Sequence, residues 1–98
     1  MKYKIRVEPA VILDIQDAID WYNSRQKGLG KKFHDSIKKN FQTLTTKPFY
    51  QIRYDDIRCL PVKGFPFMIH FTISEEKKIV TVRAVFNTSR DSKNWKDL

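Results

Sequence analysis

The hydrophobic pattern changes its period along the chain, and its first part predicts a strand. Tyr3, Ile5 and Val7 alternate with lysine and arginine, a period of two that is typical of a half-buried strand. Pro9 then lacks the N–H that a strand ladder needs. We therefore expect a short first strand that ends before Pro9.

Two helical stripes follow this strand. Apolar residues recur at helical spacing from Ala10 to Gln26, and again from Leu29 until Pro48 stops the pattern. Gly28 and Gly30 lie in or beside the short connection, where glycine permits a tight reversal. The two segments are therefore predicted to form an antiparallel helical hairpin that buries its stripes against another layer.

The second half of the chain is read as strands over residues 56–62, 67–73 and 79–86. Polar or glycine-containing turns at 63–66 and 74–78 join them. The predicted fold class is α+β: an N-terminal strand, an antiparallel helical hairpin, and then a three-stranded antiparallel portion of a small, mostly antiparallel sheet. We expect residues 1–98 to form a single domain.

Alternation within the strands predicts which side chains face the helices. The core face of the last two strands is assigned Phe67, Ile69, Phe71, Ile73, Val80, Val82, Ala84 and Phe86. In the strand before them, Ile57 and Cys59 are expected to be buried. The opposite face then receives Lys4, Arg6, Arg58, His70 and Arg83. The open face of the sheet is therefore predicted to be basic.

The charge balance adds a class of partner. Nineteen lysines and arginines against 11 acids give a formal net charge of +8, which favours an anionic partner, either a nucleic acid or an acidic protein segment. The same charge also serves solubility, so it does not choose between partners.

Composition also excludes several classes of protein. Cys59 is the only cysteine and the chain has two histidines, so we expect no internal disulfide, metal site or cofactor. The longest apolar run, residues 65–69, is far shorter than the roughly 20 residues of a membrane span. We expect a cytoplasmic protein with no membrane partner.

Candidate chemistry centres on the open face. Arg6, Arg58 and Arg83 could clamp a phosphodiester, because guanidinium groups offer paired donors to phosphate oxygens. His70 could serve as a general acid or base. Each residue also has a structural alternative: solvated charge for the arginines, and a half-buried hydrogen-bonding role for the histidine. Tyr54 could move a proton, although packing is the more common role at a strand entrance.

The C-terminal segment is a second candidate cluster. A polar run begins at Asn87 and closes with Trp95. Arg90 could lie beside Arg83 at the edge of the basic face, while Trp95 could pack on the helices or anchor a partner.

With these residues in view, the chain resembles the RelE/ParE superfamily of toxins from bacterial type II toxin–antitoxin modules. The resemblance rests on Asp14-Ile15, Trp21-Tyr22, Gly28-Leu29-Gly30, Arg58, Gly64-Phe65-Pro66-Phe67 and the closing segment from Val82 to Trp95. The ending Val85-Phe86-Asn87-Thr88-Ser89-Arg90-Asp91 is similar to that of ParE-like members, in which a histidine usually precedes an arginine by three residues. Here that histidine is replaced by Asn87.

The resemblance implies a growth-inhibiting toxin that is neutralised by a cognate antitoxin, which we expect to be acidic and partly disordered. ParE-like members poison DNA gyrase, whereas RelE-like members cleave mRNA on the ribosome. Arg58 and Arg83 would match the phosphate-clamping arginines of RelE, but Asn87 cannot transfer a proton. The ending and the helical hairpin favour the ParE-like function.

Two alternatives remain open at this stage. One is a ribosome-dependent endoribonuclease that uses Arg58, Arg83, Arg90 and His70 as catalytic residues. The other is a nontoxic nucleic-acid-binding module that relies on the basic face alone. For binding a partner or a nucleic acid, the candidate residues are Arg6, Arg58, Arg83, Asn87, Arg90 and Trp95.

Overall fold

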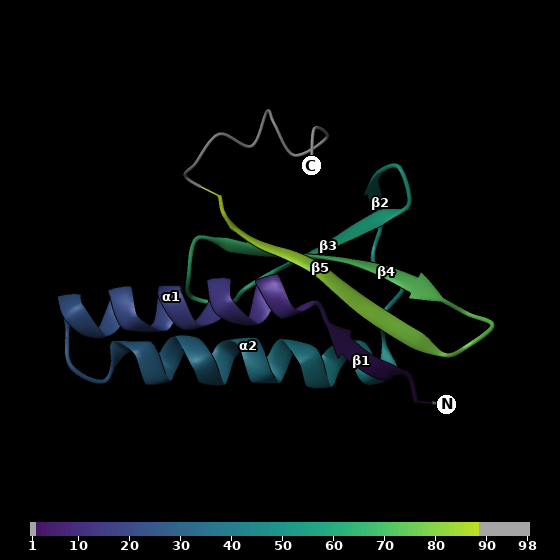
Figure 1. Ribbon diagram of the computed structural model, residues 1–98. Coiled ribbons are helices and arrows are strands. Elements are labelled where there is room, and N and C mark those ends of the chain that lie inside the picture. Colours follow the sequence, from purple (N-terminus) through teal and green to yellow (C-terminus); the bar gives the residue numbers. More distant parts are fainter. Residues whose placement is uncertain (1, 89–98) are drawn as a thin grey trace.

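A helical hairpin packs on one face of a five-stranded sheet in the computed structural model, which describes residues 2–88 (Figure 1). The elements are β1 (Lys4–Val7), α1 (Pro9–Arg25), α2 (Leu29–Thr46), β2 (Ile52–Tyr54), β3 (Ile57–Pro61), β4 (Phe67–Ser74) and β5 (Ile79–Asn87). This confirms the predicted α+β fold class and the order of its elements. No helix within the described residues is long and apolar enough to cross a membrane.

The sheet has the strand order β1-β5-β4-β3-β2, so the hairpin carries the chain from one edge to the other. From β2 the chain returns by antiparallel neighbours until β5 lies beside β1. The β1–β5 pair is parallel, with Lys4 opposite Ile79 and Val7 opposite Val82. The last strand therefore joins the first, which the sequence pattern could not specify.

Strand β2 was not anticipated. It contains only three residues, too few to display an alternating pattern, and its pairing with β3 shifts register between Ile52 and Tyr54. Because of this shift, Ile52 lies opposite Arg58 while Tyr54 lies opposite Ile57. The two side chains therefore reach different faces of the sheet.

The two helices approach each other closely at Gly30. A Cβ atom built on this glycine would lie 2.5 Å from the backbone oxygen of Ile19 and 2.6 Å from the side chain of Asn23. The Gly30 N–H donates a 2.8 Å hydrogen bond to Asn23 Oδ1, which ties the start of α2 to α1. Gly28 supplies the left-handed turn before it, with φ of 86°.

The core lies between the hairpin and the sheet. Its fully buried side chains include Phe33 and Leu44 of α2, Ile69 and Phe71 of β4, and Val82 of β5. An aromatic cluster extends it towards the hairpin tip, where the rings of Tyr22, Phe33, Phe65 and Phe67 lie 4.9–6.1 Å apart. The predicted core residues of β4 are therefore confirmed.

The predicted faces of β5 are wrong beyond Val82. His70 pairs with Ala84 whereas Phe71 pairs with Val82, so Arg83 is an extra residue in the ladder. Such a bulge reverses the alternation after it. Val85 consequently turns into the core, while Ala84 and Phe86, which were assigned to the core, lie on the face away from the helices.

The predicted faces of β3 are also wrong. Arg58 lies opposite Phe71, a core residue, and Cys59 lies opposite His70. Because directly paired residues share a face, Arg58 lies on the helix side of the sheet and Cys59 on the other. The pattern misled because Cys59 and Leu60 are both buried, so apolar residues alternate in neither register.

We predict that Gly30→Ala destabilises the fold. The added methyl group meets backbone that cannot move without separating the helices, and overpacking of this kind costs about 1–3 kcal/mol. Thermal or chemical unfolding measures the change, with the exposed substitution Lys32→Ala on the same helix as a control. Equal stability of the two variants would contradict the close approach.

Candidate functional site

The proposed proton-transfer residue, His70, lies inside a buried cluster. Tyr54 and His70 Nδ1 form a 2.9 Å hydrogen bond, Cys59 Sγ lies 3.5 Å from the same nitrogen, and the Phe86 ring packs edge-on at 4.9 Å. The hydroxyl of Tyr54 can donate only if Nδ1 is unprotonated. The imidazole is completely buried.

Burial sets the charge state of this cluster. Desolvation, and secondarily the positive charge of Arg53, lower the pKa of His70 from 6.5 to about 4. Desolvation also raises the pKa of the Cys59 thiol and of the Tyr54 hydroxyl. All three groups are therefore neutral near pH 7 and stabilise the sheet, with Tyr54 joining β2 to β4.

Arg58 does not lie near His70, because the two occupy opposite faces of the sheet. Its Nη1 donates a 2.7 Å hydrogen bond to the backbone oxygen of Tyr50, and its guanidinium carbon lies 5.6 Å from the centre of the Phe49 ring. The prediction that Arg58 belongs to the open basic face is therefore wrong. The bulky aromatic side chains after α2 hold it on the helix side.

Arg83 and Arg6 do share the open face, near its β1 edge. Arg83 forms a 2.6 Å ion pair with Glu8 and donates a 3.2 Å hydrogen bond to Thr72. Arg6 lies opposite Thr81, which in turn pairs with Thr72. The charge of Arg83 is thus partly compensated, and this edge is less basic than predicted.

The remaining candidates lie at or beyond the end of the described chain. Asn87 is the last residue of β5 and lies opposite Phe67. Arg90 and Trp95 lie outside the described residues. Within residues 2–88 there is no group of three His, Cys, Asp or Glu side chains that could hold a metal ion.

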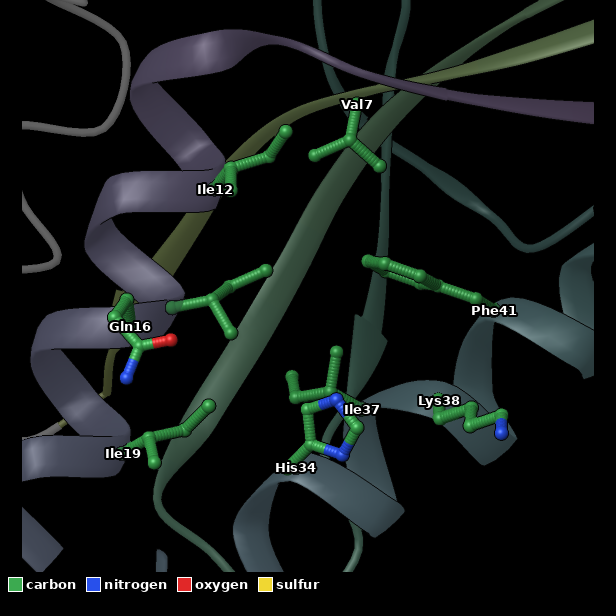
Figure 2. A pocket seen from close by; sticks show the side chains of 9 residues that line it. Val7, Ile12, Gln16, Ile19, His34, Ile37, Lys38 and Phe41 are labelled. Carbon is green, nitrogen blue, oxygen red and sulfur yellow. The ribbon is translucent and has the colours of Figure 1, made fainter.

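An apolar groove between the helices and β1 was not predicted from the sequence. Its volume is about 310 Å³, and Figure 2 shows side chains from both helices lining it. The lining residues are Val7, Ile12, Ile15, Gln16, Ile19, His34, Ile37, Lys38 and Phe41. The signal was present in the spacing of Ile12, Ile15 and Ile19, a second apolar stripe on α1.

The lining of this groove, which we call the hairpin groove, is apolar apart from a few polar side chains. Helix α2 contributes Lys38 and His34, and helix α1 contributes Gln16. An apolar segment with acidic residues on the α2 side would match both the lining and the charge.

A family model described as the ParE toxin of the type II toxin–antitoxin system parDE matches residues 5–92. This match covers the helical hairpin, all of the sheet except Lys4, and Asn87. No curated protein sequence matches the chain closely enough to count as a relative.

Three solved structures share the fold at low sequence identity. A chain of the chromosomal ParDE system of Pseudomonas aeruginosa has a TM-score of 0.76 and 13% identity, over 88% of this chain and 96% of its own. A mutant of the Escherichia coli toxin RelE in the free state has a TM-score of 0.70 and 14% identity, over 98% and 93%. The archaeal RelE–RelB complex of Pyrococcus horikoshii has a TM-score of 0.61 and 13% identity, over 93% and 100%.

We predict that folding stability falls as pH decreases from about 6.5 towards about 4. The lowered pKa of His70 means that the unfolded chain binds a proton in this window while the folded chain does not. Denaturant titrations at several pH values measure the loss, and the variant His70→Gln is expected to show a shallower dependence. Parallel pH profiles for the two proteins would contradict the assignment.

Proposed function

Because the chain belongs to the family of ParE toxins of type II toxin–antitoxin systems, we propose that it arrests bacterial growth by poisoning DNA gyrase. A cognate antitoxin neutralises it. Because DNA gyrase and the antitoxin are both cytoplasmic in this proposal, the toxin would act in the cytoplasm. Arg6, Arg83, Asn87, Arg90 and Trp95 remain our candidates for partner contacts outside the hairpin groove.

The observation that carries this proposal is the dispersal of the groups that an endoribonuclease would need. His70 is buried and neutral, Arg58 lies on the other face of the sheet, and Arg83 is paired with Glu8. General acid–base catalysis requires a proton-transfer group within hydrogen-bond reach of the substrate. This arrangement favours inhibition by protein binding over RNA cleavage.

The hairpin groove supports the antitoxin half of the proposal. A partly disordered antitoxin would gain affinity by inserting apolar side chains into a preformed groove, while an acidic residue meets Lys38 of α2. The net charge of +8 attracts such a chain over long range. The antitoxin is therefore expected to bind along the hairpin, with affinity that weakens as salt is added.

Controlled expression in a bacterial host tests the activity. We expect DNA breaks to accumulate before growth stops, with mRNA intact in the same samples, and purified toxin to inhibit supercoiling by gyrase. Host cells with a mock-induced vector provide the control. Early codon-phased mRNA cuts with intact DNA would instead assign the RelE-like activity.

The variant Ile12→Asp tests the antitoxin site. Ile12 lines the hairpin groove and is 55% exposed, so an added carboxylate should leave the fold intact while opposing an acidic, apolar partner. We expect antitoxin affinity to fall at least about tenfold, because a charge is placed in an apolar contact. Co-expression of the antitoxin should then fail to restore growth.

The neighbouring substitution Leu13→Asp is the matched control, because Leu13 is 67% exposed and does not line the groove. If Ile12→Asp bound the antitoxin as tightly as Leu13→Asp, the antitoxin would have to bind elsewhere.

A further inference from the structure

A second exposed apolar surface lies beyond the C-terminal end of α2, on the helix side of the sheet. Phe49 is 55% exposed and Ile52 is 46% exposed, in the segment that leads into and begins β2. Ile52 lies directly opposite Arg58, whose guanidinium packs over the Phe49 ring. We call these three residues the Phe49 surface. It includes none of the residues that line the hairpin groove.

Four separate segments of the chain hold this surface in place. The Phe49 ring meets the Tyr3 ring edge-on, with 5.9 Å between their centres. Lys78, in the turn between β4 and β5, lies over the Tyr3 ring, with Nζ 5.4 Å from its centre. The Tyr3 N–H donates to Thr45 O at the end of α2. A cation, two rings and a second cation thus form a continuous row from Lys78 to Arg58.

Contacts with the core hold this row on its inner side, while Phe49 is exposed to solvent on its outer side. Tyr50, next to Phe49, packs against the core residue Phe71, and its backbone oxygen holds the Arg58 guanidinium. An ordered aromatic and arginine pair, with an aliphatic neighbour and little entropy left to lose, is the composition of an energetic anchor in protein interfaces. The core does not require Phe49 or Ile52 to be apolar, because both are already exposed.

We propose that the Phe49 surface binds a segment of the toxin's target protein that carries apolar side chains and a carboxylate. The carboxylate would meet Arg58 or Lys78, at one end of the row or the other, and the apolar side chains would cover Phe49 and Ile52. A nucleic acid fits less well, because the exposed aliphatic side chain of Ile52 offers a base neither a ring to stack on nor a hydrogen bond.

The inference rests on the proposed function in one respect, because gyrase is the target protein used as the probe. Affinity of the full-length toxin for the purified gyrase holoenzyme is measured together with thermal unfolding and growth arrest. Phe49→Ser is expected to weaken gyrase binding at least about tenfold and to abolish arrest, with only a small fall in unfolding temperature from the lost ring contact with Tyr3. Leu13→Ser, which removes a more exposed side chain (67% against 55% for Phe49) from α1, is expected to behave like the wild type.

A pair of substitutions at one position tests the charge of the partner. Ile52→Glu and Ile52→Lys remove the same apolar contact, but only the glutamate opposes an acidic segment. Ile52→Glu is therefore expected to bind gyrase more weakly than Ile52→Lys. The reverse order would overturn the acidic character of the partner.

The failures of the two proposals are distinguishable. Wild-type binding to gyrase that Phe49→Ser leaves unchanged overturns the surface and leaves the function standing. If the wild type does not bind gyrase, the proposal of gyrase poisoning is wrong, and growth arrest then tests the Phe49 surface. Loss of arrest in Phe49→Ser, but not in Leu13→Ser, supports the surface. Arrest that Phe49→Ser retains overturns it. A toxin without either activity overturns both. Binding of a single-stranded DNA 20-mer that depends on Phe49, with gyrase binding unaffected, also overturns the protein assignment.

Discussion

The parallel pairing of β1 with β5 is the constraint on which the rest of this structure depends. It brings the first and last described strands together, so the hairpin must cross one face of the sheet from the β1 edge to the β2 edge. Helix α2 ends at Thr46, before the chain reaches β2. The hairpin groove forms where the helices meet β1, and the Phe49 surface forms where the chain leaves them.

The bulge at Arg83 divides the open face into two chemically different parts. On the β1 side of the bulge, Arg6, Thr72, Thr81 and Arg83 make a polar edge. Beyond it the reversed alternation places Phe86 over His70, and Tyr54 from β2 completes a neutral, buried cluster. One extra residue in β5 therefore converts a predicted basic face into a partly apolar one.

The two exposed apolar surfaces suit different partners. The hairpin groove has an apolar lining with Lys38 on its α2 side, and we propose that it takes an apolar segment with acidic residues on that side. The Phe49 surface is smaller and is built around one arginine that aromatic rings hold in place. If a toxin binds its target and its antitoxin on separate surfaces, the antitoxin can neutralise it in two ways. The bound antitoxin can block access of the target sterically, or it can bind beside the target and change the complex. The distinction is open to measurement because each surface has an exposed residue that can be changed without disturbing the core.

The sequence alone determined the fold class and every element except β2, because periods of two and 3.6 residues, Pro9, Pro48 and the glycines of the hairpin act locally. It also placed Arg83 and Arg6 on the same face of the sheet, although only the β1–β5 pairing brings them to one edge. Tertiary structure alone decided the side of Arg58, the burial of His70 and the position of Phe86. The positions of His70 and Phe86 depend on the one-residue bulge in β5. The side of Arg58 depends on β3, where Cys59 and Leu60 are both buried, so the apolar pattern does not show which face is which. Both exposed apolar surfaces likewise arise from long-range packing, because neither is contiguous in the chain.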